Sequence, residues 1–210
     1  MEIESNFDQE RQNAFKLHCF LGALLNVLVI VVQLVDLTLT QWVHYCYFDW
    51  GLYAGETSET GLDQRVSNNE SYEDMNNNMC DYYKDVIDAA CNDFCGNLTR
   101  FWTAGGIMIG FLSVCIFINA TYVVLHICMY FGKKCKHWIW YHGIWAPTII
   151  FFMGLTIYLA VGDIYGVDKT WDGDENLRTG HGLSLAFSIV VLHFLPAIHS
   201  YIFTSQELRK

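Results

Sequence analysis

Four long apolar blocks constrain this chain more than any other feature of its sequence. They cover residues 17–39, 101–130, 138–161 and 183–203, and each is close to the ~20 residues that cross a ~30 Å hydrocarbon core as a helix. No block contains Lys or Arg, and the one acid is Asp36. We therefore predict an all-α integral membrane protein whose four transmembrane helices form a bundle.

The composition excludes several other classes of protein. Hydrophobic residues make up 53% of the chain, and only 16% is charged, where about a quarter is usual. The 12 Lys and Arg residues are too few and too scattered for a nucleic-acid partner. We find no Walker, GxSxG, HExxH or dinucleotide-binding motif, so we expect no enzyme, no cofactor and no resident metal.

The distribution of charge predicts the orientation in the membrane. The short basic loop of residues 131–137 carries three lysines and no acid, which places it in the cytoplasm together with both tails, 1–16 and 204–210. The acidic leader has no signal-peptide cleavage site, so the first span is expected to stay in the protein. Residues 40–100 and 162–182 then form outward loops, which hold most of the acids behind the net charge of -10.

Small and polar residues within the spans predict where the helices pack. Gly22, Asn26, Gln33 and Asp36 share one face of the first helix. Gly106 and Gly110 form a GxxxG motif in the second helix with Ser113 roughly in line, for which internal packing is favoured over a homo-oligomer face. A proton or cation relay of Asp36 with His126, His193 or His199 is the functional alternative, but for His193 an interhelical hydrogen bond is favoured.

The first outward loop has the chemistry of a small ectodomain in an oxidising compartment. Its candidate disulfide residues are Cys46, Cys80, Cys91 and Cys95, and three pairings are open. A four-cysteine zinc site is the weaker alternative. Asn69 and Asn97 begin glycosylation sequons. In the second loop, the acids of residues 168–176 fit a solvated turn better than a calcium site.

The layout resembles the claudin superfamily, which includes the peripheral myelin proteins and claudin-like regulatory subunits of channels. The residues that carry the resemblance are Trp42, Gly51, Leu52, Tyr53 in place of the family's Trp, the cysteines Cys80 and Cys91, and Arg100. The resemblance implies a four-helix bundle with a small β-sheet ectodomain, and a disulfide between Cys80 and Cys91.

Three hypotheses for function follow. The leading one is a non-enzymatic auxiliary, adhesion-type or assembly subunit that contacts another integral membrane protein, located in the plasma membrane or the secretory pathway. The second is a supernumerary subunit of a mitochondrial inner-membrane complex. The third is a small channel or transporter that uses Asp36 and the intramembrane histidines.

Overall fold

The computed structural model describes residues 2–39, 41–45, 48–57, 70–81, 94–132, 144–162 and 178–208. The chain divides into two compact units. The first, which we call the helical unit, comprises Met1–Gln33, Ser113–Phe151 and Ile189–Lys210. The second, which we call the sheet unit, comprises Leu34–Leu112 and Phe152–Ser188.

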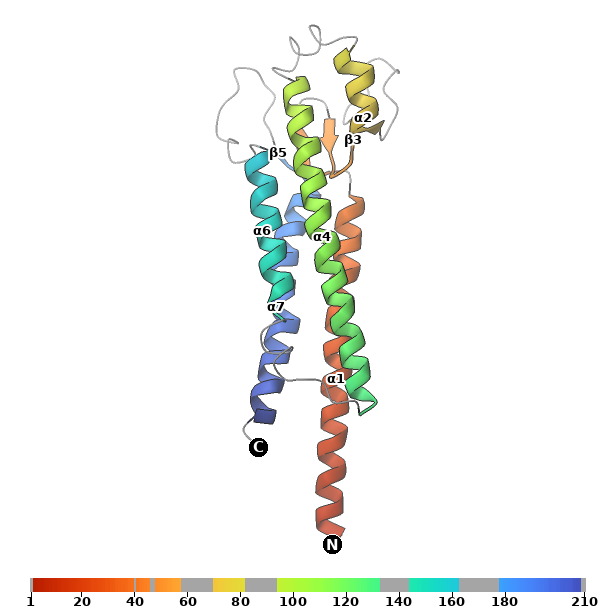
Figure 1. Ribbon diagram of the computed structural model, residues 1–210, viewed down its shortest axis with the longest axis vertical. Coiled ribbons are helices and arrows are strands. Elements are labelled where there is room, and N and C mark those ends of the chain that lie inside the picture. The colour runs from red at the N-terminus through yellow and green to blue at the C-terminus, as the bar shows by residue number, and fades with distance from the viewer. Residues whose placement is uncertain are drawn as a thin grey trace. The chain divides into compact units, whose positions relative to one another are not determined.

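Four helices contribute residues to both units: α1 (Glu2–Thr38), α4 (Phe94–Tyr130), α6 (Ala146–Val161) and α7 (His181–Leu208), labelled in Figure 1. Three of them contain stretches long and apolar enough to cross a membrane, namely Gln9–Thr38, Phe94–Tyr130 and His181–Phe203. These stretches contain three of the four predicted spans except for Leu39, which supports an integral membrane protein. The shorter α6 is apolar too, but the first residues of its predicted span, 138–143, lie outside the described part.

The helices are longer than the apolar blocks that predicted them. The helix α1 extends back to Glu2, into the predicted tail, and α7 continues to Leu208. The helix α4 begins at Phe94, so its first residues belong to the predicted first loop of residues 40–100. Hydropathy locates the part of a helix that suits lipid, whereas backbone hydrogen bonds continue into polar sequence.

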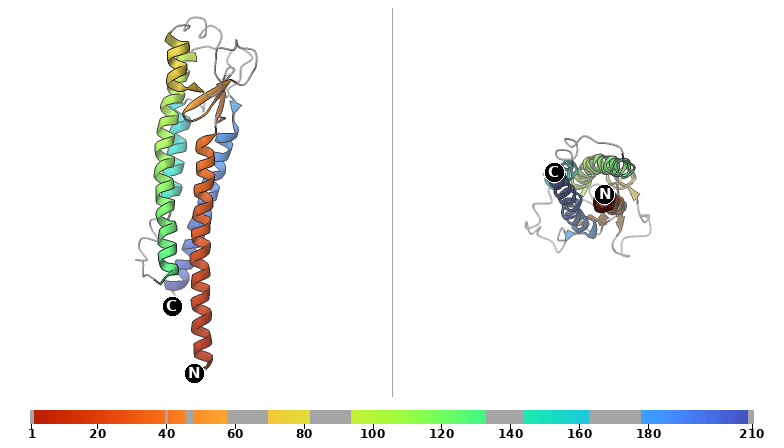
Figure 2. Two further views of the ribbon diagram at one scale, coloured as in Figure 1. Left: turned by 90° about the vertical axis from the view of Figure 1, so that its right-hand side faces the viewer. Right: turned by 90° about the horizontal axis from the view of Figure 1, so that it is seen from below.

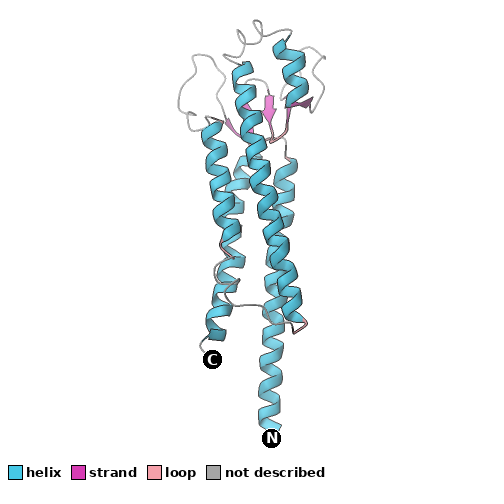
Figure 3. Cartoon of the chain, in the orientation of Figure 1, coloured by secondary structure: helices cyan, strands magenta, loops and turns pink. Residues whose placement is uncertain are grey.

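A five-stranded antiparallel sheet forms the centre of the sheet unit. Its strands are β1 (Val43–Tyr45), β2 (Phe48–Trp50), β3 (Ala54–Thr57), β4 (Glu70–Ser71) and β5 (Arg178–Thr179). The spatial order is β4-β3-β2-β1-β5, so four strands from one loop form a meander and the fifth joins from the other loop. Figure 3 shows these strands in magenta. Val43 pairs with Trp50 on one side and with Thr179 on the other.

Large aromatic side chains fill the core beside this sheet. The ring of Trp50 lies 5.7 Å from that of Tyr72, 5.6 Å from Phe94 and 5.5 Å from Phe101. The Tyr72 hydroxyl donates to the Gly51 carbonyl at 2.6 Å, which satisfies its one polar atom inside the apolar core. Burial raises the pKa of Tyr72 above its ordinary value, because the charged phenolate would lose its hydration there.

Tyr72 begins the short helix α2 (Tyr72–Met75), which runs on into a π-helical turn, η1 (Asn76–Cys80). The helix starts there because the Ser71 hydroxyl accepts from the Asp74 backbone N–H, a standard N-cap. At the far end of the turn, Cys80 forms a disulfide with Cys95 in α4. The pairing of Cys80 with Cys91 that the resemblance implies was therefore wrong. Cys46 and Cys91 lie outside the described residues.

One apolar cluster in the helical unit is built from α4, α7 and the residues just before α6. Tyr122, Ile144 and Ala197 are buried there, and Ile118, Leu125, Met129 and Trp145 pack against them. Pro196 lies within α7, which continues beyond it. The two further views in Figure 2 show the course of α1, α4 and α7.

Two adjacent glycines of α4 give a test of the sheet unit. A Cβ at Gly105 would collide with the Leu52 carbonyl, whereas one at Gly106 meets no described atom within 4 Å. We expect Gly105→Ala to lower the free energy of unfolding by about 1–3 kcal/mol, because backbone must move. Gly106→Ala should leave it unchanged or raise it by up to about 1 kcal/mol through helix propensity. Unfolding in mixed micelles, followed by tryptophan fluorescence, measures both; equal effects would contradict the packing.

The disulfide gives a second test. Trypsin cleaves after Lys84 and Arg100, which places Cys80 in one peptide and both Cys91 and Cys95 in the next. We expect mass spectrometry of the non-reduced digest to find these peptides linked in the Cys91→Ser variant. Cys95→Ser should lose the link, because Cys95 holds the sulfur that bonds Cys80. The reverse pattern would restore the pairing that the resemblance implies.

Candidate functional site: polar side chains buried between helices

Three polar side chains from three helices meet inside the helical unit. Gln33 of α1, Asn119 of α4 and His193 of α7 are 0%, 1% and 2% exposed. The Asn119 amide donates to Gln33 Oε1 at 3.2 Å, and Gln33 Nε2 lies 3.2 Å from His193 Nε2. Asn119 Nδ2 lies 3.4 Å from the same ring nitrogen. We call these three residues the polar cluster.

The backbone fixes the tautomer of His193. Its Nδ1 lies 3.0 Å from the Ile189 carbonyl, which only accepts, so Nδ1 carries the hydrogen. Nε2 is then the acceptor and faces the amide hydrogens of Gln33. The Phe151 ring, 5.3 Å from the imidazole, covers it on another side. Each member of the polar cluster thus has a defined donor or acceptor role.

Such a cluster suits helix assembly. A polar side chain between helices in an apolar medium gains by pairing, and each pair contributes roughly 0.6–1.7 kcal/mol in membrane proteins. These hydrogen bonds also constrain the geometry of the bundle. Rotating any of the three helices would separate the donors from the acceptors. We infer that the polar cluster sets the rotation and register of α1, α4 and α7.

A second close approach lies on the same face of α1. A Cβ at Gly22 would overlap the ring of His126 from α4, so only glycine admits the imidazole there. His126 is 3% exposed. One turn further along α1, the amide of the fully buried Asn26 donates to the Gly22 carbonyl at 2.8 Å. This stretch of the predicted polar face therefore packs against α4. Farther towards the N-terminus, His18 Nδ1 lies 3.4 Å from His199 Nε2 of α7.

Asp36 belongs to the sheet unit and is fully buried. Its backbone carbonyl accepts from the indole N–H of Trp42 at 3.1 Å. Within the described residues, its carboxylate has no hydrogen-bond partner. His126, His193 and His199 belong to the helical unit, so a relay that joins them to Asp36 stays a prediction.

Among the described residues, none packs against the GxxxG motif, so its internal packing stays a prediction. A Cβ at Gly106 or at Gly110 would meet no atom of the described residues within 4 Å, and Ser113 is exposed as well. The glycine of α4 that does pack closely is the neighbouring Gly105, against Leu52. Residues adjacent in a helix differ by about 100° in direction, so the motif points away from Leu52 and meets none of the described residues.

The residues that carry the family resemblance include both buried and exposed side chains. Trp42, Gly51 and Leu52 are buried in the sheet unit, while Tyr53 is 46% exposed and Arg100 is exposed in α4. Of the two sequons, Asn97 is only 7% exposed within α4, which does not fit a glycan, and Asn69 lies outside the described residues.

Two metal sites were considered as alternatives from the sequence, a zinc site and a calcium site. Cys80 and Cys95 are joined in a disulfide, so they are not zinc ligands and the four-cysteine zinc site was wrong. Residues 168–176, the weaker calcium candidate, lie outside the described part of the chain.

Asn119 is the member of the polar cluster that sequence reasoning missed. It was visible as an amide in the middle of an apolar span, which in membrane helices usually faces another helix.

No protein-family model matches the chain, and no curated protein is significantly similar to it.

The polar cluster predicts measurable coupling between two helices. In a double-mutant cycle of Gln33→Leu and His193→Leu, we expect a coupling energy of ~0.6–1.7 kcal/mol, because each single variant already breaks the shared contact. Reversible unfolding in mixed micelles measures it. The control cycle pairs His193→Leu with Asn26→Leu, whose amide bonds within its own helix, and should give a value near zero. Equal coupling in both cycles would contradict a specific contact.

Proposed function

We propose that this chain is a non-enzymatic, claudin-like four-span membrane protein that acts as an auxiliary, adhesion-type or assembly subunit of a larger membrane complex. Its partner is another integral membrane protein. The fourth span would be residues 138–161. The 16 residues of α6 reach only about 24 Å at helical rise, so the residues before Ala146 would complete the crossing.

The proposed orientation of the protein in the membrane depends on the basic loop of residues 131–137. If residues 131–137 face the cytoplasm, the sheet unit carries the extracellular subdomain, in the plasma membrane or the secretory pathway. The disulfide between Cys80 and Cys95 supports this placement, since such bonds persist in oxidising compartments. The sheet supports the claudin-like proposal, because it combines strands from both predicted outward loops, as a small ectodomain requires.

The observation that carries the proposal is the outward face of α4. Trp102, Gly106 and Gly110 lie on this face, with Trp102 43% exposed and no described atom near either glycine. Two glycines one turn apart allow another helix to approach the backbone closely, which is the main source of contact energy between helices in lipid. Lipid tails fill such a furrow less well than a matching helix does. We call this surface the glycine face.

The sheet unit supplies the second contact surface. Its strands, disulfide and buried aromatic core hold the loop of Tyr53 in place, and the Tyr53 carbonyl accepts from the Tyr72 backbone N–H at 3.4 Å. The Tyr53 side chain is exposed, and tyrosine is enriched where proteins bind one another. A rigid surface costs little entropy on binding, which suits an accessory subunit.

Affinity purification of the full chain in a mild native detergent tests the glycine face. We expect the wild type to retain a membrane-protein partner in a larger complex. The Gly106→Leu/Gly110→Leu variant should lose most of it, because leucine side chains keep the helices apart. No described atom lies near either glycine, so the variant should unfold at the wild-type denaturant concentration or at a higher one.

The matched control is Thr156→Leu, which adds a leucine at an exposed position of α6. It should retain the partner fully. A wild-type chain that migrates alone, or a partner that stays bound to the double leucine variant, would overturn the proposed use of the glycine face. Cross-linking of two differently tagged copies separates a second copy of this chain from a different partner.

A further inference from the structure

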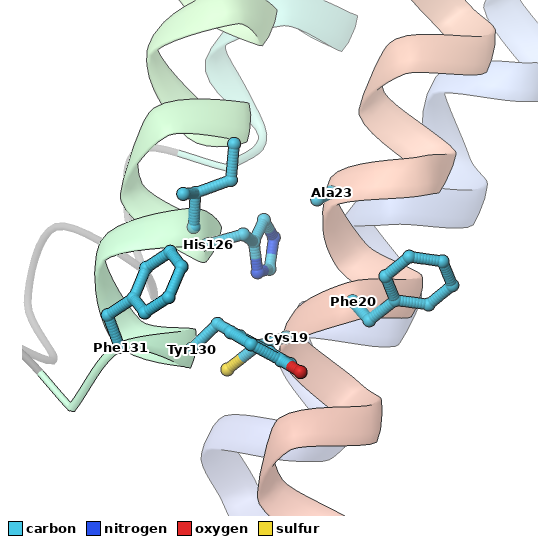
Figure 4. A pocket seen from close by; sticks show the side chains of 7 residues that line it. Cys19, Phe20, Ala23, His126, Tyr130 and Phe131 are labelled. Atoms are coloured by element: carbon cyan, nitrogen blue, oxygen red, sulfur yellow. The ribbon is translucent and has the colours of Figure 1, made fainter.

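Two neighbouring hollows follow the seam between α1 and α4 in the helical unit. The first has a volume of about 140 Å³. Its lining residues are Cys19, Phe20, Ala23, His126, Ile127, Tyr130 and Phe131, and Figure 4 shows six of them labelled. The side chain of His126 extends from α4 towards α1 in that view. This hollow is apolar apart from the imidazole, the thiol and the Tyr130 hydroxyl.

The second hollow is larger, at about 480 Å³, and lies nearer the ends of the helices. Its lining includes Gln12, Phe15 and Lys16 of α1 and Gly132 just after α4. Tyr130 and Phe131 line both hollows, so the two lie next to each other along the same helices. We call the joined space the α1–α4 groove. Its larger part falls in the range of about 300–1,000 Å³ that is typical of ligand sites.

The polarity of the groove changes along its length. One end lies in the apolar spans between Ala23 and Ile127. The other contains Lys16, which is half-buried, and the exposed Gln12. An ammonium group next to an apolar channel matches an amphiphile with a negative head and a hydrocarbon tail.

The groove also opens towards the bilayer. Phe20, Ile127 and Phe131 on its border are 58%, 46% and 75% exposed, in or next to spans that are apolar enough to lie in lipid. Small residues create the space: Gly22 admits His126 next to α1, and Ala23 fills little of the volume beside it. The groove is therefore accessible from the side of the helices that lipid would cover.

We propose that the α1–α4 groove is a binding site for an anionic phospholipid. A segment of one acyl chain lies in the apolar hollow beside Ala23 and Ile127, and the phosphate pairs with Lys16. The aromatic rings of Tyr130 and Phe131 lie between the two, at the depth where aromatic side chains meet the headgroup region. The site is separate from the glycine face and does not depend on the proposed partner.

Native mass spectrometry of the full chain tests this site, with phosphatidylglycerol and phosphatidylcholine added at equal concentrations. We expect preferential retention of phosphatidylglycerol. Lys16→Gln should reduce that preference about fivefold, the value of one lysine at an anionic surface. Arg11→Gln, which removes the same charge at an exposed position of α1 outside the groove, should not reduce it.

Ala23→Phe fills the apolar hollow and should reduce retention of both lipids, whereas Val191→Phe, at a 66% exposed position of α7, should not. If Ala23→Phe fails to fold, Ile127→Trp fills the same hollow from its border. Equal retention of phosphatidylglycerol by the groove variants and their controls would overturn the site and leave only non-specific annular lipid. A wild type without preference between the two lipids would overturn the role of Lys16.

Discussion

In a bilayer core no water is present to satisfy polar groups, and the structure of this chain follows from that constraint. The backbone meets it by forming long helices. Exposed hydroxyl groups meet it locally: Thr103, Thr121 and Thr156 each donate to the carbonyl four residues earlier in the same helix. Three buried side chains in the middle of their helices, those of Gln33, Asn119 and His193, meet it across helices. Polar groups in the spans therefore report on packing, which hydropathy alone does not.

Polar groups buried in the sheet unit also need hydrogen-bond partners. Trp42 provides such partners for residues of several elements. Its backbone N–H donates to the Trp50 carbonyl, and its own carbonyl accepts from Gly180, so it joins residues from both loops. Its indole N–H donates to Asp36 in α1, and its ring packs against Tyr158 in α6 at 5.1 Å. Gly182 has no side chain to obstruct the ring. A single tryptophan thus fixes the start of the sheet to three helices within this unit.

The sequence predicted the parts of this structure that depend on local pattern. Apolar length located α1, α4 and α7, and the polar face of α1 contained Gln33, which pairs as an inward-facing residue. It did not predict the partner of Cys80, because spacing along a chain does not determine which sulfurs meet in space. It missed Asn119 as the partner of Gln33, since an amide in one span carries no information about the helix that it faces. Pairings between distant residues depend on how the helices pack in three dimensions, which the sequence pattern does not give.

The glycines of α4 show why packing faces are hard to read in a membrane helix. In a soluble protein, the buried face is apolar and the outer face polar, but here both are apolar. Phe101, Ala104, Met108 and Leu112 are the buried set, and Trp102, Gly106 and Gly110 are the exposed one, yet composition barely separates them. What separates them is side-chain volume matched to a neighbour: Gly105 is needed because Leu52 is there. By the same reasoning, Gly106 and Gly110, which no part of the described chain approaches, are compatible with the partner helix proposed above.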